Sequence, residues 1–290
     1  MCALEARPLA AAATEPHLPD AIPRAPGRTT VRLDLVIPAH NEEHRIDRTL
    51  HAYRSSCTEP ETRFLVALDR CTDRTAEVVS RHAADDARVR VIEYPKLGKG
   101  GVIMETLRRC TADFVGFVDA DCATPPAEIL QLVETAEHTD GAIASRRHPA
   151  SVLPRHRRPF RRLTAAGFAF GIRRLFRLPY ADTQCGAKVL RREAVQACLP
   201  FLSSRDFLFD VDLLVVARRL GLRVVEVPTV WIDRDGSRLS AGRDSVRMAM
   251  SSLLLWMRHR MLPVDPAAAA VVRPRPRRVS HATRAVEQVA

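Results

Sequence analysis

The chain has 290 residues and a net charge of +11, with 46% hydrophobic and 27% charged residues. This composition is ordinary for a globular protein and excludes a low-complexity or fibrous chain. The basic excess indicates anionic partners. Because only 5% of the residues are aromatic and none interleave with basic residues in a stacking pattern, we expect no nucleic acid among those partners.

The seven cysteines are scattered and form no C-x-x-C pair, so we expect neither a zinc site nor a disulfide framework. The N-terminal stretch lacks the apolar run of a signal peptide, and no stretch of about 18 apolar residues indicates a spanning helix. We therefore expect a cytoplasmic protein, or one at the cytoplasmic face of the membrane.

Both ends of the chain differ from its middle. Residues 1–30 are rich in alanine and proline, and residues 263–290 hold an alanine run and an arginine/proline stretch. Segments of this kind bury too little apolar surface to fold, so we expect a disordered leader and a disordered basic tail. The folded unit is then predicted over residues 31–262.

Strands and helices alternate through the first half of this unit. Apolar runs predict strands at residues 33–37, 64–68, 88–93, 114–118 and 142–145. Helices are predicted from Asn41 as N-cap, over 73–84, over 100–110, and from Pro125-Pro126 onward. This order favours an α/β fold with a mainly parallel sheet, helices on both faces, and a ligand site at the carboxyl ends of the strands.

The second half is less regular. It predicts helices at 163–178, 207–220 and 244–262, and strands at 224–227 and 230–232. The last helix is rich in methionine and leucine and ends in arginine and histidine, so we expect a C-terminal amphipathic helix.

Asp119-Ala120-Asp121 directly follows the fourth predicted strand. Alternate residues of an extended segment can direct two carboxylates at one cation. Mg²⁺ and Mn²⁺ are typically held by few carboxylates together with substrate phosphate oxygens, and such a cation would neutralise a departing nucleotide diphosphate. The alternative is a solvated turn with two surface aspartates, but the position after a buried strand favours a metal site.

Three further loops follow the first three strands. The segment 96–101, Lys-Leu-Gly-Lys-Gly-Gly, opens a helix and suits a phosphate, with a flexible basic loop as the alternative. The segment 38–43 can present backbone and a carboxylate to a nucleotide, although Asn41 and Glu43 can equally cap the helix that follows. Asp69 is a similar candidate, while Asp73 is explained as well by helix capping.

Carboxylates recur in the second half. Asp182-Thr183-Gln184-Cys185-Gly186 forms one group, and Asp210 and Asp212 lie in an otherwise apolar helix, where unpaired carboxylates are costly. We expect these side chains to face a site or an arginine, with structural salt bridges as the alternative. A carboxylate can accept an acceptor's proton, but a phosphate acceptor is already ionised and needs positioning and charge screening instead. Cys122 and Cys185 are interpreted as small, buried, unreactive thiols.

Arginines gather between the two halves. Five of them fall within eight residues, at positions 155, 157, 158, 161 and 162, after Arg146 and Arg147. Such a cluster beside an amphipathic segment suits an anionic membrane surface or a lipid phosphate, so we predict peripheral membrane contact. The alternative is a solvated face with charges that complement helix C-termini.

Together these motifs resemble those of the family 2 inverting glycosyltransferases with a GT-A fold, and most closely the polyprenyl-phosphate glycosyltransferases such as the dolichyl-phosphate β-glucosyltransferases. The similar stretches run in the family's order over residues 33–262: 37–43, 98–101, 119–121, 145–146, 182–188, 209–214 and 235–239. A bare D-x-D is common, whereas D-T-Q-C-G-x-K followed by F-D-V-D-L-L is specific. The resemblance implies a nucleotide-sugar half at 31–145 and an acceptor half at 146–262. It also implies UDP-glucose as donor, Mg²⁺ or Mn²⁺ as cofactor, polyprenyl phosphate as acceptor, and inversion at the anomeric carbon.

The resemblance further implies roles for individual residues. Nucleotide-sugar binding falls to Pro38, Ala39, Glu42, Asp69, Lys99, Asp119 and Arg146, and metal binding to Asp119 and Asp121. Acceptor binding falls to Thr183 and Gln184 and, from the arginine cluster, to Arg155 and Arg158. Asp210 is the leading catalytic carboxylate, with Asp182 as the second.

Two departures from the family pattern leave parts of this interpretation open. The family usually ends its second strand with two aspartates, and this chain has Leu68-Asp69, so the nucleobase is not fixed. Eukaryotic relatives carry an N-terminal membrane anchor that we do not find here, so a soluble phosphate, sugar or natural-product hydroxyl is the alternative acceptor. A non-enzymatic nucleotide or nucleic-acid binder is a third reading, disfavoured because both carboxylate motifs are present. The oligomeric state is not predicted.

Overall fold

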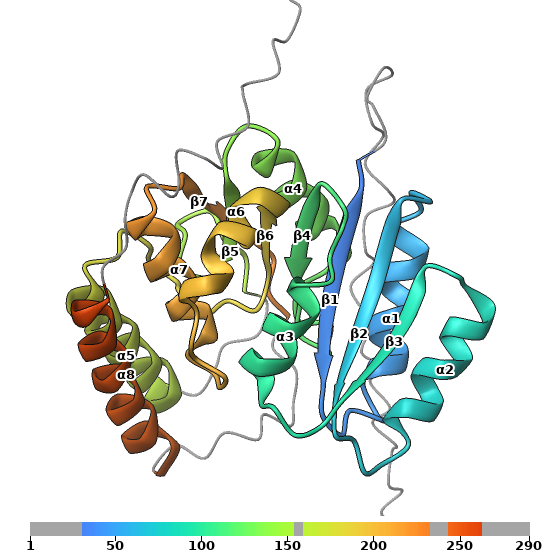
Figure 1. Cartoon of the computed structure of the whole chain (residues 1–290), viewed down its shortest axis with the longest axis horizontal. Helices are drawn as coiled ribbons and strands as arrows, with labels where there is room; N and C mark the ends of the chain where they lie inside the picture. The colour runs from blue at the N-terminus through green and yellow to red at the C-terminus, as the bar shows by residue number, and fades with distance from the viewer. Residues whose placement is uncertain (1–30, 154–158, 233–242, 263–290) are drawn as a thin grey trace, which may run out of the picture.

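The structure is a computed structural model that describes residues 31–153, 159–232 and 243–262 (Figure 1). The predicted leader at 1–30 and tail at 263–290 lie outside these residues, so both stay predictions. Within the described part, one sheet has the strand order β3-β2-β1-β4-β6-β5-β7. Its strands are β1 Leu33–Ala39, β2 Thr62–Asp69, β3 Val89–Tyr94, β4 Phe114–Phe117, β5 Gly141–Ser145, β6 Lys188–Arg191 and β7 Val224–Pro228.

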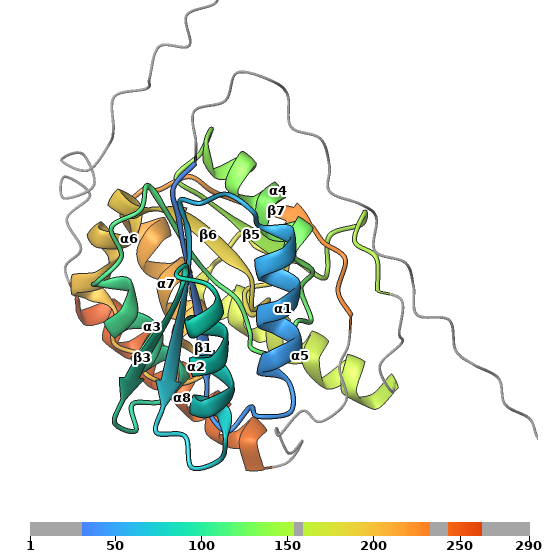
Figure 2. The same ribbon diagram turned by 90° about the vertical axis from the view of Figure 1, so that its right-hand side faces the viewer.

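Helices lie on both faces of this sheet (Figure 2). They are α1 Ile46–Ser56, α2 Thr75–Asp85, α3 Lys99–Leu107, α4 Pro126–Ala136, α5 Pro159–Phe176, α6 Arg192–Cys198, α7 Phe209–Arg219 and α8 Arg243–Met261. Side chains of β1 alternate between two cores: Leu35 and Ile37 pack with α1, α2 and α4, whereas Val36 packs with α3, α6 and α7. Two buried cores on one sheet give a three-layer α/β architecture.

Helices α5 and α8 lie side by side outside α7 (Figure 1). They contribute Ile172 and Leu255 to the core that contains α7. The predicted C-terminal helix over 244–262 is therefore confirmed as α8. Among the described helices, none combines the length and the apolar character needed to cross a bilayer.

Strand β6 is the antiparallel member of the sheet. It pairs with β4 and β5, so that Lys188 lies opposite both Phe117 and Ile143. All other pairings between named strands are parallel. The predicted mainly parallel α/β sheet is thus confirmed, with one reversed strand that the sequence pattern did not indicate.

Two local predictions are wrong. The first helix begins at Ile46, and Asn41 has a positive φ of 56° in the turn before it, so Asn41 is not its N-cap. The segment 230–232 is not a strand of the sheet, since only Val230 forms an isolated bridge, to Val152. Asn41 is instead held by a side-chain bond to Thr72, and residues 231 and 232 donate backbone hydrogen bonds to Val152 and Ala123.

Candidate active site

Three segments that are far apart in the sequence meet at one edge of the sheet. Asp119 and Asp121 follow β4 at the carboxyl end of the parallel strands. Because β6 runs antiparallel to β4, the loop 182–187 that precedes β6 returns to the same edge. Helix α7 begins there too, since Lys188 at the start of β6 forms an ion pair with Asp210 in the first turn of α7. The topology therefore joins the D-x-D motif to the motifs of the second half.

Asp119 and Asp121 share this edge with Lys99. Lys99 Nζ donates to Asp119 Oδ1 at 2.6 Å, and Asp121 Oδ1 accepts from the backbone N–H of Ala123 at 3.0 Å. Burial first, and then the charge of Asp119, raises the pKa of Asp121 above its ordinary value. Burial alone would lower the pKa of Lys99, but the charges of Asp119 and Asp210 raise it instead. The surroundings thus disfavour the charged form of Asp121, and a bound cation would favour it.

Gly186 fixes where the Asp119 carboxylate lies. A Cβ atom at position 186 would overlap the carboxylate of Asp119, so this oxygen pair rests directly against the glycine backbone. The glycine of the D-T-Q-C-G motif is therefore required by close approach, and it links the acceptor half to the predicted metal site.

The residues at this edge fit a hard divalent cation. No group of three or more His, Cys, Asp and Glu side chains that could hold a metal occurs among the described residues. The two carboxylates of Asp119 and Asp121 instead provide the sparse oxygen set that Mg²⁺ and Mn²⁺ use when substrate phosphates complete the shell. Lys99 already pairs with Asp119, so a bound divalent ion would share this carboxylate with the lysine.

The glycine loop before α3 is packed on the chain's own backbone. Gly98 has a positive φ of 81°, and Cβ atoms at Gly98 and Gly100 would overlap the carbonyl oxygens of Arg205 and Ser204. The backbone N–H of Gly101 donates to the Arg205 carbonyl at 3.1 Å. The glycines thus allow the backbone of residues 204–206 to pack closely against this loop, and we did not predict this contact. Whether a phosphate also binds here stays a prediction.

Asp69 ties the end of β2 to the same loop. Its Oδ1 accepts from the backbone N–H of Leu97 at 2.7 Å, and its Oδ2 pairs with Lys96 at 2.9 Å. These bonds hold the Asp69 side chain at the carboxyl end of β2. They do not test its predicted contact with the nucleotide.

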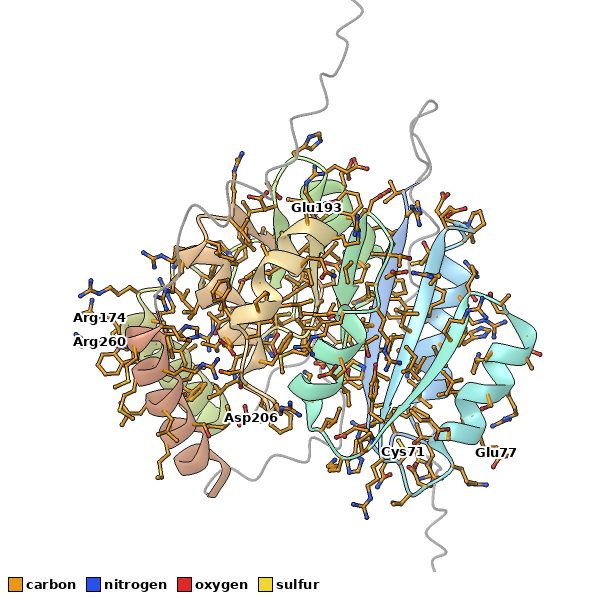
Figure 3. The ribbon with its side chains drawn as sticks, in the orientation of Figure 1. Cys71, Glu77, Arg174, Glu193, Asp206 and Arg260 are labelled. Carbon is orange, nitrogen blue, oxygen red and sulfur yellow. The ribbon has the colours of Figure 1, made fainter. Side chains whose placement is uncertain are left out.

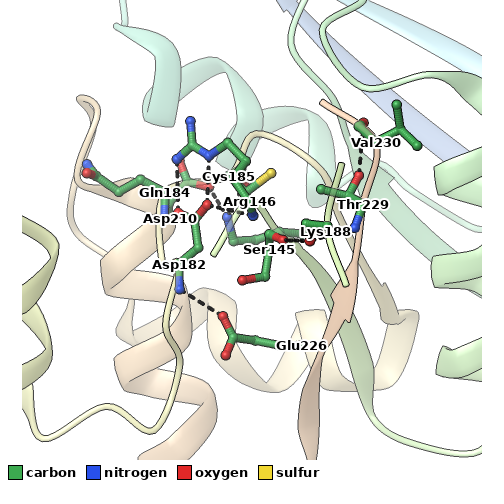
Figure 4. A network of polar contacts seen from close by, with 11 residues as sticks. Ser145, Arg146, Asp182, Gln184, Cys185, Lys188, Asp210, Glu226, Thr229 and Val230 are labelled. Atoms are coloured by element: carbon green, nitrogen blue, oxygen red, sulfur yellow. Dashed lines mark hydrogen bonds and ion pairs between the residues drawn. The ribbon is translucent and has the colours of Figure 1, made fainter. Parts of the chain in front are cut away.

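Arg146 and Asp182 form a buried bidentate pair (Figure 4). Arg146 Nε and Nη2 donate to the two Asp182 oxygens at 2.7 and 2.9 Å, and the guanidinium lies over the Trp231 ring. Although burial would raise the pKa of Asp182, Arg146 lowers it to about 2. Glu226 holds this loop from below, accepting from the backbone N–H groups of Ala181 and Asp182 at 2.7 and 2.8 Å.

Lys188 and Asp210 form a second buried pair (Figure 4). Lys188 is fully buried and also donates to the carbonyl of Cys185 at 2.6 Å. The pair joins β6 to α7 and brings Asp210 within electrostatic range of Lys99. Neither Lys188 nor Glu226 was singled out in the sequence. Lys188 ends the D-T-Q-C-G-A-K motif, and its place within that motif was the sequence signal that could have identified it.

Asp212 forms no ion pair with an arginine among the described residues, and it does not face the site. Its Oδ2 accepts from the backbone N–H groups of Ser203 and Ser204 at 2.7 and 2.8 Å, and its Oδ1 pairs with His259 of α8 at 2.7 Å. The structural alternative is thus the correct one for Asp212, because a fully buried carboxylate must have its lone pairs satisfied.

The turn after β1 is cross-linked to the turn after β2. Asn41 Oδ1 accepts from the backbone N–H of Thr72 at 2.8 Å, and Glu43 accepts from that of Arg74 at 3.0 Å. These bonds replace the predicted capping of the first helix. Asp73 was predicted as a possible cap, and its Oδ1 does accept from the backbone N–H of Thr75 at the start of α2.

The remaining predicted residues fall into three groups. Pro38 and Ala39 end β1 and Glu42 follows in the same turn, at the carboxyl edge. Thr183 is buried and Gln184 is half-buried in the loop 182–187. Arg155 and Arg158 lie outside the residues whose side chains are described. Burial raises the pKa of Cys185 to about 12, which agrees with an unreactive thiol.

The family profile described as Glycosyl transferase family 2 matches residues 34–199. Among curated relatives, the glycosyltransferase AglD of Haloferax volcanii is 30% identical over 241 residues, covering 81% of this chain and 38% of AglD. The dolichyl-phosphate beta-glucosyltransferase ALG5C of Trichomonas vaginalis is 30% identical over 218 residues, covering 70% of this chain and 65% of that protein. The chain thus spans less than two thirds of the length of either relative.

A solved structure has the same architecture. The glucosyl-3-phosphoglycerate synthase from Mycobacterium tuberculosis, in complex with Mn²⁺, uridine-diphosphate and phosphoglyceric acid, has a TM-score of 0.61 and 19% identity. The match covers 83% of this chain and 86% of that chain. At this identity the likeness concerns the fold alone, and it confirms the predicted GT-A class.

Proposed function

This chain belongs to glycosyltransferase family 2, and from that premise we propose that it transfers a hexose, glucose from UDP-glucose, to a polyprenyl phosphate. The proposal includes dependence on Mg²⁺ or Mn²⁺ and inversion at the anomeric carbon. The observation that carries it is the meeting of Asp119, Asp121 and Lys99 with the Asp182–Lys188 segment and Asp210 at one sheet edge.

On the donor side, the chain supplies two carboxylates and a cation. A divalent ion held by Asp119 and Asp121 would take up the negative charge of the departing diphosphate when bound. Lys99 adds a second positive charge at the N-terminus of α3, where a helix favours anions. The Asp119 carboxylate rests against the backbone of Gly186, which places it between the donor side and the acceptor half.

On the acceptor side, the chemistry requires positioning more than proton transfer. A phosphate acceptor is ionised near neutral pH, so no general base is needed to create its nucleophilic oxygen. The buried pairs Arg146–Asp182 and Lys188–Asp210 hold the loop 182–187 rigid against β6 and α7. We assign Asp210 the role of orienting the acceptor, together with Thr183 and Gln184, and Arg146 that of attracting a phosphate of the nucleotide-sugar donor.

The names of the relatives support the acceptor class. ALG5C is a dolichyl-phosphate beta-glucosyltransferase, as is the human protein that is 28% identical over 247 residues. A lipid phosphate requires the enzyme to work at a bilayer. The net charge of +11 suits an anionic surface, and we propose that the protein acts at the cytoplasmic face of the membrane.

The test is a donor panel with one lipid acceptor in two forms. UDP-glucose, other UDP-sugars and GDP-sugars are incubated with Mn²⁺ and either polyprenyl phosphate or unphosphorylated polyprenol, and products are identified by mass spectrometry. We expect a glucosylated polyprenyl phosphate from UDP-glucose alone and no product from polyprenol.

Three results would contradict the proposal. Equal transfer to polyprenol would show that the acceptor phosphate is not used. Transfer only to soluble sugars, phosphates or hydroxyl compounds would replace the lipid acceptor with the soluble alternative. Full turnover after removal of divalent ions with EDTA, with wild-type folding retained, would rule out the metal.

A further inference from the structure

A cavity lies at the end of the molecule where the C-termini of α5, α7 and α8 come together. Its volume is about 490 Å³, and four arginines line it: Arg177, Arg218, Arg219 and Arg260. Leu175, Phe176, Val215 and Trp256 form its apolar part, and His259, which is paired with Asp212, completes the lining. No carboxylate in the described part of the chain lines the cavity. In Figure 3, Arg260 and the neighbouring Arg174 lie together on the outer edge formed by α5 and α8.

Basic residues at helix C-termini often only complement the helix dipoles, and this is the alternative to a binding site. Arg219 complements the C-terminus of α8 in this way, because it donates to the carbonyl oxygens of His259 and Leu262 at 2.5 Å each. Among the described residues, Arg177, Arg218 and Arg260 have no carboxylate within ion-pair distance. Three helix ends contribute roughly half a negative charge each, which is less than the four guanidinium charges. The cavity therefore keeps a net positive charge.

Helix α8 beside the cavity has one buried face and, opposite to it, an exposed apolar stripe. Ser252, Leu255 and His259 are buried against the domain. On the other side, a stripe with helical spacing is exposed, made of Met250, Leu253, Leu254, Met257 and Met261. Leu254 is 61% exposed and Met261 is 81% exposed. Phe170 of the adjacent α5 adds a further exposed aromatic ring.

The basic cavity and the apolar stripe adjoin each other along α8, because Trp256 and Arg260 line the cavity and the exposed Met257 and Met261 directly follow them in the sequence. Arg258 and Arg260 fall on either side of the stripe at a spacing of 100° per residue, with Arg260 stacked on Trp256 at 5.0 Å. Apolar side chains bordered by arginines and an aromatic ring match the boundary between acyl chains and headgroups.

We propose that this surface docks on an anionic phospholipid bilayer, with one phosphate-bearing headgroup held in the Arg177–Arg218–Arg260 cavity and the α8 stripe inserted beside it. This site is distinct from the active site, because it lies at the C-terminus of α7, whereas Asp210 lies in the first turn of that helix. It orients the protein on the membrane and does not take part in transfer.

The test measures vesicle binding of the full chain in the absence of donor and acceptor, so its outcome does not depend on the proposed reaction. Wild-type protein is floated with phosphatidylcholine vesicles and with phosphatidylcholine/phosphatidylglycerol vesicles. We expect binding to the anionic vesicles that is lost with Arg218→Glu/Arg260→Glu. At about fivefold per basic residue, loss of two positive charges predicts at least a roughly 25-fold weaker partition.

The matched control is Arg81→Glu/Arg90→Glu, which makes the same charge change at exposed positions of α2 and β3. It should retain most of the binding, since it lies at the other side of the sheet. Leu253→Ser/Leu254→Ser should weaken binding to anionic vesicles without changing the thermal midpoint, because both side chains are exposed. Circular dichroism and thermal unfolding check that each variant is folded.

Three outcomes would overturn the proposal. One is equal loss of binding in the control and the cavity variants, which would reduce the effect to net charge. Another is stabilisation of the wild type by inorganic phosphate without any vesicle binding, which would make the cavity a site for a free anion. The third is a dimer in light scattering that Leu253→Ser/Leu254→Ser dissociates, which would assign the stripe to a second copy of the chain.

Discussion

The carboxylates of the proposed donor side and of the proposed acceptor side differ in how far their side chains are exposed. On the donor side, the Asp119 side chain is 31% exposed and its cationic partner Lys99 is 22% exposed. On the acceptor side, the side chains of Asp182 and Asp210 are only 3% and 4% exposed; their partners are Arg146, which is 21% exposed, and Lys188, which is fully buried. The carboxylate predicted to bind the metal is thus more accessible than the two carboxylates that hold the loop 182–187.

This difference has an energetic consequence. Solvent screens the attraction within a partly exposed ion pair, so the pair contributes little to the free energy of folding. A buried pair contributes little as a pair, but loss of one partner leaves an uncompensated charge and is costly. Substitutions on the donor side should therefore reduce activity, and those on the acceptor side should first reduce stability.

The largest expected effect is that of Lys188→Met. It leaves Asp210 buried without its cation, so we expect a loss of about 3–5 kcal/mol in the free energy of unfolding, measured with urea. Lys188→Met/Asp210→Leu should recover most of this stability, because two apolar side chains replace the pair, but it should not recover transfer.

The matched substitution is Lys96→Met, at the pair that Lys96 forms with Asp69. Lys96 is 47% exposed, and Asp69 keeps its bond from the backbone N–H of Leu97, so we expect a loss below about 1 kcal/mol. Equal destabilisation by the two substitutions would remove the distinction between the two sides.

Asp121→Asn should have the next largest effect, on activity instead of stability. Loss of one of the two predicted metal ligands should lower the transfer rate about 10²–10³-fold. The unfolding midpoint should stay the same or rise, because burial disfavours the charge of Asp121. Asp113→Asn, just before the other end of β4, is the control and should leave both quantities unchanged. A large fall in stability with Asp121→Asn would instead make this aspartate a structural residue.

The donor side could be predicted from sequence because its signals are local. Apolar runs such as 64–68 and 114–118 give parallel strands, and the polar residues directly after them must lie at the carboxyl edge. The predicted GT-A fold is confirmed for the same reason. Lys99 follows β3, and Asp119 and Asp121 follow β4, so the topology places all three at the carboxyl edge of the sheet.

The acceptor side could not be predicted in the same way. Strand β6 has two apolar residues between Lys188 and Arg191, too short for any periodic pattern. Its reversed direction is what places the loop 182–187 at the site, and no local signal encodes that direction. Asn41 shows the related limit: its sequence position suits an N-cap, but its bond to Thr72, 31 residues away, determines its conformation.

A smaller effect is expected from pH, with opposite signs on the two sides. Arg146 lowers the pKa of Asp182 from 3.8 to about 2, so this carboxylate contributes stability above pH 3.8 that is lost as the pH falls through about 2. The contribution is about 2 kcal/mol and should disappear from the acid unfolding curve of Asp182→Asn. The pKa of Asp121 is raised, so its protonated form stabilises the fold, and that contribution is lost as the pH rises through the raised value. Urea midpoints of the two Asn variants across the acid range measure both signs, and parallel curves would contradict the assignment.

The smallest expected effect concerns the one contact that joins the two sides, between Gly186 and Asp119. Gly186→Ala would place a methyl group on the Asp119 carboxylate and turn its oxygens away from the donor side. We expect about tenfold weaker binding of Mn²⁺ in the presence of UDP, measured by calorimetry, because a residue that orients a metal ligand has been altered. Gly167→Ala in α5 makes the same change where no atom lies within 4 Å, so it should leave Mn²⁺ binding unchanged. It should also stabilise the helix by roughly 0.5–1 kcal/mol. Unaltered Mn²⁺ affinity in Gly186→Ala, with normal folding, would mean that Asp119 is free to adjust and that the acceptor half does not set the geometry of the donor half.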